Sequence, residues 1–148
     1  MATTRRAEVS WQGDLMSGTG KVTAASSGRF DELPVSWARR TEQPEGWTSP
    51  EELLAAAHAS CFAMALAGGL ARAGTPPERL EVAATVTFDR VDGGWRVTSS
   101  SLEVRGRLPG GGDADAFRRA AEAAKDGCPI SQALKGNVAL SVSATLDA

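Results

Sequence analysis

The sequence predicts an α+β fold in which a single domain spans residues 1–148. Three observations indicate it: a long, almost wholly apolar helix pattern in the middle of the chain, a pair of alternating strand patterns around Asp92-Gly93-Gly94, and shorter extended segments towards both ends. Neither an internal repeat nor a long linker divides the chain, and a domain of this length buries roughly 70% of the surface that its unfolded chain exposes. Helices and strands that alternate in separate runs in this way are typical of the α+β class.

The N-terminal segments predict a hairpin followed by an edge strand. Ala7 to Trp11 alternates weakly between apolar and polar residues, Gln12-Gly13-Asp14 is a turn signal, and Gly18 to Ala25 carries Thr and Val. A third extended segment is expected near Leu33 to Arg40. Pro34 places that segment at the start of a strand or at a sheet edge, because proline cannot donate to the ladder.

The clearest boundary in the sequence is the start of the central helix. Ser49 is expected as the N-cap, Pro50 at the first helical position and Glu52 at the third, an arrangement that forms a capping box. The helix is predicted to run to about Arg72, where the glycine and prolines that follow end it.

This central helix is apolar on nearly every side. Between Leu53 and Leu70 its only strongly polar side chain is His58, and most of the others are small. Such a helix has to be buried all round. Because the chain has few large apolar side chains with which to enclose it, we expect a homodimer that shares this core, and twofold dimers are also the commonest assembly.

The second half of the chain predicts a long hairpin, two helices and a last strand. Two strands are expected at Leu80 to Val91 and Trp95 to Leu108, since β-branched residues alternate there around the Asp92-Gly93-Gly94 turn. A helix is predicted over Ala116 to Lys125, capped by one of the two preceding Asp residues. Cys128-Pro129 then begins a short helix, and the last strand has four alternating apolar positions: Val138, Leu140, Val142 and Ala144.

Composition excludes several classes of function. Lys plus Arg total 16 against 18 Asp plus Glu, the formal net charge is −2, and only 5% of residues are aromatic, so we expect no nucleic-acid partner. The first residues lack the apolar core of a signal peptide, and no run of about 18 apolar residues is evident, so we expect no membrane and a cytoplasmic location. Neither a cofactor nor a bound metal is expected.

The two cysteines are the side chains best suited to chemistry, because a thiol is apolar enough to bury and nucleophilic once ionised. Cys61 lies among Ala residues, Phe62 and Met64, which is typical of packing. Cys128 precedes a proline at the first position of a helix, so its sulfur lies near the positive end of a helix dipole, which acidifies a thiol. Considered separately, these surroundings favour Cys128 as the reactive residue.

Three stretches carry a resemblance to a known family. Thr48 to Phe62 (TSPEELLAAAHASCF), Gly127 to Lys135 (GCPISQALK) and the opening hairpin Ala7 to Asp14 (AEVSWQGD) together resemble the OsmC/Ohr family of hydroperoxide-reducing proteins over nearly the whole chain. The HAxCF and CPxSxxLK patterns are more similar to the OsmC branch than to the Ohr branch. The resemblance implies an OsmC-like fold, with an antiparallel sheet around a long buried central helix, in an intertwined homodimer.

The resemblance also implies a thiol peroxidase that reduces organic hydroperoxides, or hydrogen peroxide, to protect against oxidative or osmotic stress. Cys61 matches the family's peroxidatic cysteine and Cys128 the resolving one, while Arg40 and Glu51 match the pair that supports the thiolate. Arg39 is the neighbouring alternative to Arg40. An external dithiol, such as a lipoylated protein, is implied as the reductant.

These residue types suit that chemistry. A free thiol with a pKa of about 8.5 is mostly protonated at neutral pH, and burial raises its pKa further. The guanidinium of Arg40 stays charged when buried, and lowering the pKa of Cys61 by about two units requires roughly 2.7 kcal/mol. At 1.5 Å per residue, Glu51 and Cys61 are separated by roughly 15 Å along one helix. If both serve one site, Glu51 and Arg40 come from the partner chain.

Four apolar residues, Leu54, Phe62, Met64 and Trp37, are candidates for a substrate channel, together with Leu53 and Trp47. Ordinary core packing is the alternative for each of them.

Three other functions remain open. Cys61 and His58, one helical turn apart, could form a nucleophile and base for acyl transfer. Cys61, Cys128 and His58 could hold zinc, although a fourth ligand and the usual short spacing are missing. The chain could also be a non-catalytic dimer, either structural or binding an apolar ligand.

Overall fold

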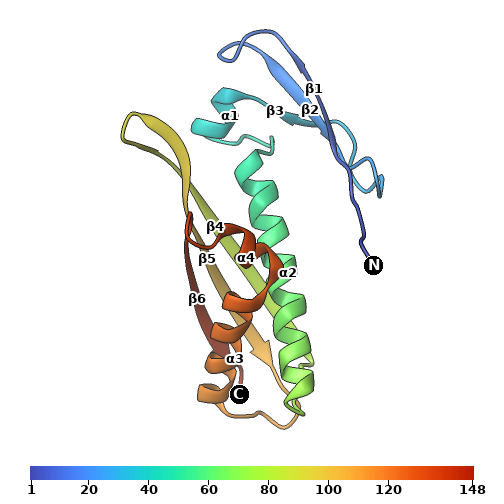
Figure 1. The fold of residues 1–148 in the computed structure, drawn as a ribbon, viewed down its shortest axis with the longest axis vertical. Helices are drawn as coiled ribbons and strands as arrows, with labels where there is room; N and C mark the ends of the chain where they lie inside the picture. Colours follow the sequence, from blue (N-terminus) through green and yellow to red (C-terminus); the bar gives the residue numbers. More distant parts are fainter. The chain divides into compact units, whose positions relative to one another are not determined.

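The computed structural model describes residues 1–148 and contains two compact units, Met1–Leu53 and Leu54–Ala148. The expectation of a single domain stays a prediction. The first unit holds a three-stranded antiparallel sheet in the order β1-β2-β3 (Figure 1). β1 (Glu8–Gln12) pairs with β2 (Thr19–Thr23), so the predicted N-terminal hairpin is confirmed. Trp11 stands opposite Gly20, where a Cβ would meet the indole ring at 2.7 Å, so only glycine leaves room for it.

The third extended segment is shorter than predicted. β3 covers only Leu33–Val35, an edge strand in which Pro34 stands opposite Lys21. The expected continuation to Arg40 is wrong, because α1 (Trp37–Thr41) begins there instead. Ser36 is its N-cap, and the Ser36 hydroxyl accepts a hydrogen bond from the backbone N–H of Arg39 at 3.3 Å.

The central helix begins and ends as the sequence predicts. α2 spans Pro50–Arg72, and the Ser49 hydroxyl accepts a hydrogen bond from the backbone N–H of Glu52 at 3.1 Å. Gly74 follows the last turn with φ of +84°, the left-handed conformation in which glycine commonly ends a helix.

The burial of α2 differs from the prediction of a helix enclosed on all sides. One stripe is buried in the chain, while a second, at similar spacing on another side, is exposed. By length and composition α2 is also long and apolar enough to cross a membrane, contrary to the sequence expectation, although core helices of soluble proteins meet the same criterion. The buried stripe is His58, Phe62, Leu66 and Leu70, and the exposed stripe is Ala57, Ser60, Met64 and Ala71.

The second unit is built on a three-stranded sheet in the order β4-β5-β6 (Figure 1). β4 (Arg79–Val91) and β5 (Gly94–Arg107) form the predicted long hairpin, with Asp92 and Gly93 at φ of 51° and 80° in the turn. β6 (Ala139–Leu146) pairs with β5 in parallel, so the expectation of a wholly antiparallel sheet is wrong at this pair. Two helices connect β5 to β6, and a crossover of that kind returns the chain in the same direction.

Those two helices are α3 (Ala114–Gly127), capped by Asp113, and α4 (Pro129–Leu134), capped by Cys128. α3 extends beyond the predicted Ala116 to Lys125 at both ends. α2, α3 and β5 enclose the core, which shows that both helices cover the same face of the sheet. Removing Phe62 or Phe117 from it by substitution to Ala costs about 3–5 kcal/mol. The buried core members are Phe62, Leu66, Leu70, Leu102, Val104, Leu108, Phe117, Ala121, Ala124 and Cys128.

Candidate active site

The two cysteines lie together in the second unit. Cys61 is partly exposed on α2, and Cys128 is fully buried at the start of α4. Both are free thiols, and they are neighbours, since each shifts the pKa of the other. The fold therefore brings together two thiols that are far apart in the sequence, so that an oxidant that takes two electrons from them could join them as a disulfide.

Within one chain, Cys61 is the less acidic thiol. Burial is the main cause that raises the pKa of Cys61 above its ordinary value, and the adjoining Cys128 raises it further. A hydrogen bond from the backbone N–H of Ile130 acts in the opposite direction but does not compensate. Cys61 thus needs a further positive charge to ionise at neutral pH.

The pKa of the Cys128 thiol is shifted in the opposite direction to that of Cys61. Burial is the largest single cause and acts to raise its pKa, but the hydrogen bonds from the hydroxyl and backbone N–H of Ser131, together with the smaller effects of Cys61 and Ile130, outweigh it, and the pKa of the thiol is lowered. Both Ser131 donors lie 3.4 Å from the Cys128 sulfur. The local electrostatics of the chain agree with the interpretation drawn from the isolated sequence context, in which Cys128 is the more reactive of the two.

A buried histidine adjoins this pair. His58 is fully buried, and its Nδ1 lies 2.7 Å from the hydroxyl oxygen of Ser100 on β5. Its Nε2 lies 2.8 Å from the hydroxyl oxygen of Ser131 on α4, and burial lowers the pKa of the imidazole. Sequence reasoning missed Ser100 and Ser131. Ser131 has a signal in retrospect, since it follows the N-cap Cys128 at the third helical position, whereas Ser100 is one of several serines on its strand.

The surroundings of His58 and the two cysteines weigh against two of the alternative functions, acyl transfer and zinc binding. Both ring nitrogens of His58 are engaged by serines, which leaves neither for a nucleophile–base pair with Cys61. Zinc is not favoured either, because no group of three His, Cys, Asp or Glu side chains has an arrangement that could hold a metal ion.

In the first unit, Arg40 and Glu51 form a tight ion pair. Arg40 donates to the Glu51 carboxylate from Nε at 3.0 Å and from a terminal nitrogen at 2.8 Å. Glu51 is buried at the start of α2, and the Arg40 guanidinium lies 5.9 Å from the centre of the Trp37 ring. Arg39 instead pairs at 2.6 Å with Glu45, whose side chain is exposed. Of the two neighbouring arginines, Arg40 is the one that Glu51 holds.

The four candidate channel residues are dispersed. Trp37 borders a small, largely apolar hollow of about 90 Å³ beside Arg40, in the first unit. Phe62 is fully buried in the core, as its ordinary packing alternative predicts, and Leu54 is half-buried. Met64 is 74% exposed and borders a groove between α2 and α3.

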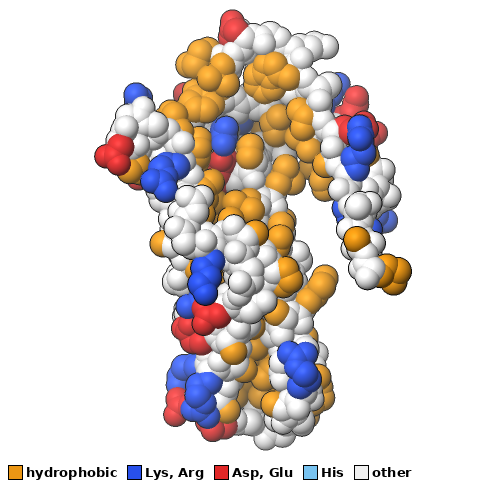
Figure 2. Space-filling view, in the orientation of Figure 1, with side chains coloured by type: hydrophobic (Ala, Val, Ile, Leu, Met, Phe, Trp, Pro, Cys, Tyr) orange, Lys and Arg blue, Asp and Glu red, His pale blue; other side chains and the backbone are white.

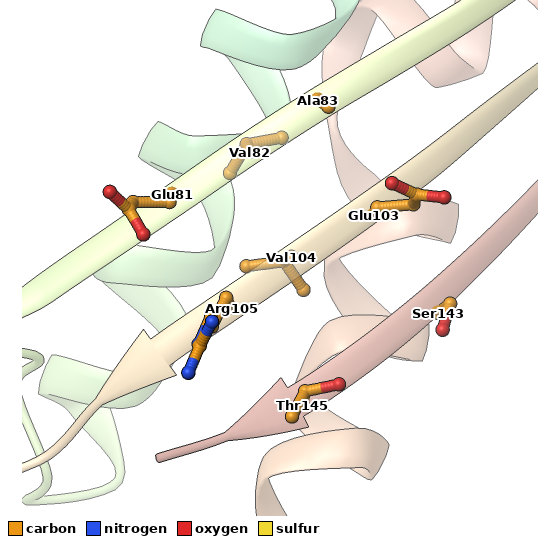
Figure 3. Close-up of a pocket in the computed structure, with 8 residues that line it drawn as sticks. All are labelled: Glu81, Val82, Ala83, Glu103, Val104, Arg105, Ser143 and Thr145. Carbon is orange, nitrogen blue, oxygen red and sulfur yellow. The ribbon is translucent and has the colours of Figure 1, made fainter.

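Another hollow, which no cysteine lines, opens on the second sheet (Figure 3). Its lining comes from three strands and includes two carboxylates, Glu81 and Glu103, beside Arg105. The hydroxyls of Ser143 and Thr145 complete it. Without a thiol, a histidine or a buried charge, this hollow offers no redox chemistry.

Comparison with known proteins adds one consistent result. Residues 43–143 match the family model described as OsmC-like protein. Peroxiredoxin OsmC of Escherichia coli (strain K12) is 39% identical over 136 residues, which cover 92% of this chain and 93% of that protein. Organic hydroperoxide resistance protein OhrA of Bacillus subtilis (strain 168) is 34% identical over 123 residues, covering 80% and 82%. The crystal structure of OhrB from Bacillus subtilis is similar with a TM-score of 0.71 at 25% identity, covering 96% of this chain and 98% of that one.

Proposed function

Since the chain belongs to the OsmC-like family, we propose that it is a thiol-dependent peroxidase that reduces organic hydroperoxides to alcohols. The OsmC-like fold predicted from the resemblance is confirmed by the same comparisons, and the identity to OsmC exceeds that to OhrA. The observation that carries the proposal is the pair of free, neighbouring thiols, Cys61 and Cys128, each of which shifts the pKa of the other.

The proposed reaction proceeds in two steps. The Cys61 thiolate attacks the terminal oxygen of the hydroperoxide, the O–O bond breaks, and the alkoxide takes a proton and leaves as the alcohol. Cys61 is now a sulfenic acid. The Cys128 sulfur attacks the Cys61 sulfur, the S–O bond breaks, water leaves, and a disulfide joins the two residues. An external dithiol, such as a lipoylated protein, reduces this disulfide, because the chain has no third cysteine.

Arg40 and Glu51 supply the charge that Cys61 lacks. In the single chain the pKa of Cys61 is raised, so its ionisation requires a cation that the second unit does not provide. A guanidinium held by a buried carboxylate is such a cation, and it can also donate to a peroxide oxygen. Offsetting two units of pKa takes roughly 2.7 kcal/mol, which one desolvated ion pair can supply.

We assign this pair to the partner subunit of a homodimer. Glu51 lies in the first turn of α2, and the rise of the helix separates it from Cys61 by roughly 15 Å. The guanidinium of Arg40 lies within 2.8 Å of the Glu51 carboxylate, so it is held at the same end of the helix. A twofold dimer that brings α2 of one subunit beside that of the other would place the Arg40 of each subunit near the Cys61 of its partner.

The exposed stripe of α2 supports that dimer. Ala57, Ser60, Met64 and Ala71 leave one side of the helix uncovered in the single chain, and hydrophobic atoms are visible at the surface along α2 in Figure 2. Small residues in such a stripe allow two helices to approach closely. Cys61, which is partly exposed, lies between this stripe and the buried one.

The substrate is expected to be apolar around the peroxide. Trp37, and the hollow that it borders beside Arg40, would contact the organic group. We place the protein in the cytoplasm, where a dithiol reductant can regenerate the thiols, and assign it protection against oxidative or osmotic stress.

One titration tests the proposed function. The reduced, metal-free protein receives one equivalent of cumene hydroperoxide, and its free thiols are counted before and after. Loss of both thiols with an intramolecular Cys61–Cys128 disulfide, and cumyl alcohol as product, is the expected result. The Cys61→Ser variant is the matched control and should consume no peroxide. Retention of both thiols would favour the non-catalytic dimer instead.

A further inference from the structure

A chain of buried hydrogen bonds leads from β5 to the resolving thiol. It runs from the Ser100 hydroxyl to Nδ1 of His58 at 2.7 Å, from Nε2 of His58 to the Ser131 hydroxyl at 2.8 Å, and from that hydroxyl to the Cys128 sulfur at 3.4 Å. The exposed fractions of these residues are 0% for Ser100, His58 and Cys128 and 1% for Ser131. None of the polar atoms in the chain of bonds faces solvent.

The hydrogen bonds of this chain can be directed in two consistent ways, called settings below, which differ in which group donates at each step. When the Ser131 hydroxyl donates to the Cys128 sulfur, its oxygen accepts from Nε2–H of His58, and Nδ1 accepts from Ser100 in a neutral ring or donates to it in a protonated ring. In the reverse setting, the Cys128 thiol donates to the Ser131 oxygen, the Ser131 hydroxyl donates to Nε2, and Nδ1–H donates to Ser100. The first setting suits a Cys128 thiolate, and the second suits the thiol.

Cys128 needs a proton acceptor because it has no exposed surface. As a thiol it must lose its proton to become the nucleophile that resolves the Cys61 sulfenic acid, and no water can reach it directly. The Ser131 hydroxyl, which is bonded to the Cys128 sulfur, can only pass a proton on, and His58, which is bonded to that hydroxyl, is the base at the end of this path.

We propose that His58 accepts the proton of Cys128 through Ser131 during disulfide formation, so that Ser131 contacts the reacting sulfur and His58 acts through Ser131. This inference rests on the proposed peroxidase function. The S–H bond of Cys128 breaks as its proton moves to the Ser131 oxygen, while the Ser131 hydroxyl passes its own proton to Nε2 of His58. The Cys128 electron pair forms the S–S bond, the Cys61 S–O bond breaks, and hydroxide leaves with a solvent proton as water. When the external dithiol later reduces the disulfide, the Cys128 thiolate that is freed takes this proton back from His58 through Ser131.

The surroundings of His58 fit an acceptor. Burial alone lowers the pKa of the imidazole, so it is neutral near pH 7 and has a free electron pair in the setting that suits the Cys128 thiol. The titratable group linked to it is the Cys128 thiol, by way of Ser131 on α4, while β5 offers only the Ser100 hydroxyl. Burial is the one cause that shifts the pKa of His58. No charged side chain competes for its proton.

A single-turnover experiment separates this role from simple packing. Reduced protein is mixed with cumene hydroperoxide, and the rates of Cys61 sulfenic acid formation and of disulfide formation are measured separately across pH. His58→Gln keeps an amide that can hold Ser131 but cannot take up a proton. We expect it to slow disulfide formation about tenfold, far more than it slows the first step, and to abolish the fall in the resolving rate that protonation of His58 causes at acidic pH. A wild-type resolving rate and pH profile would overturn the proposal.

Ser131→Ala removes the connecting hydroxyl with the smallest change in volume and serves if His58→Gln does not fold. It should slow disulfide formation about tenfold. Ser141→Ala, which removes an exposed serine hydroxyl bonded to Ser101 on the same sheet, is the matched control. Equal resolving rates in Ser131→Ala and the control would contradict the relay.

A measurement without peroxide keeps this inference distinct from the proposed function. His58 is the only histidine, so its ring nitrogens give one set of NMR signals. In a Cys61→Ser background these signals should shift as Cys128 ionises, and Ser131→Ala should remove that response and raise the pKa of Cys128 by about one unit. Chemical shifts of the His58 ring that stay constant while Cys128 ionises would refute the relay, even if the peroxidase activity is present. Shifts that change with the ionisation of Cys128 would support the relay, even if that activity is absent.

Discussion

Arg40 donates hydrogen bonds to the Glu51 carboxylate from two guanidinium nitrogens, at 3.0 and 2.8 Å, while the adjacent Arg39 forms an ion pair with the exposed Glu45. Two consecutive arginines of the same helix therefore have different environments. The Arg40 guanidinium is fixed by a buried carboxylate and by the Trp37 ring, and a cation fixed in this way loses little freedom when it binds a thiolate.

The first prediction compares these two arginines. Arg40→Ala should lower the second-order rate constant for cumene hydroperoxide about 100-fold at neutral pH, the change in thiolate fraction that two pKa units represent. Arg39→Ala is the matched control and should stay within about twofold of the wild type, because an exposed ion pair contributes little. Peroxide consumption under single-turnover conditions measures both. Equal losses in the two variants would show that Arg40 has no special role.

The pH dependence of the Arg40→Ala variant provides a second prediction. Burial raises the pKa of Cys61, and without the guanidinium nothing in the chain reverses that shift. Because the pKa of Cys61 is then raised, the thiolate fraction, and with it the rate of the first step, should still rise about tenfold per pH unit as the pH passes the ordinary thiol pKa of about 8.5. The wild-type rate should level off at a lower pH. Identical pH profiles would mean that Arg40 does not acidify Cys61.

The third prediction concerns stability and His58. Burial lowers the pKa of His58 below 6.5 in the folded chain, so the unfolded chain binds more protons at acidic pH. This contribution to stability is complete above the unfolded-state pKa and is lost as the pH falls below it, by at most about 1.4 kcal/mol per pH unit. Denaturant unfolding at about pH 7.5 and about pH 5.5 should show a smaller loss for His58→Gln than for the wild type. An unchanged loss would contradict the buried, neutral imidazole.

Much of the fold was predictable because local signals agreed with it. Ser49 caps α2 as expected, and Asp92-Gly93 turns the long hairpin, since both depend only on neighbouring backbone groups. α1 was missed because the signal for it is a lone Ser36 that caps a single short helix. The parallel pairing of β6 with β5 was also missed, because strand direction depends on the path of the intervening helices and has no signature in the strand itself.

The candidate site was predictable only in part. The resemblance supplied Cys61, Cys128, Arg40 and Glu51 as residues, and the structure places the first two together in one unit and the last two together in the other. The hydrogen bonds of His58 to Ser100 and Ser131 were not predictable, because they join three elements distant in sequence, β5, α2 and α4. Phe62, which is next to Cys61 in the sequence, was a candidate for the substrate channel, but it is an ordinary core residue, so its position in the sequence did not indicate its role.

The fourth prediction concerns the exposed stripe of α2. Met64→Arg should shift the protein from dimer to monomer, because a charge buried between two apolar helices without a partner costs several kcal/mol. Ser143→Arg, on the open face of the second sheet, is the control and should remain dimeric. Sedimentation measures both. A dimeric Met64→Arg variant with wild-type stability would place the subunit interface elsewhere.

Subunit complementation tests the central claim, that Arg40 of one subunit activates Cys61 of the other. Cys61→Ser and Arg40→Ala variants, each nearly inactive alone, are mixed under conditions that exchange subunits, and the exchange is verified with differently tagged chains. A heterodimer contains one site with both an intact Cys61 and the partner's intact Arg40, so the account predicts that about half of the wild-type activity per heterodimer returns. Complete exchange without recovered activity would contradict it, because each site would then take its arginine from its own chain.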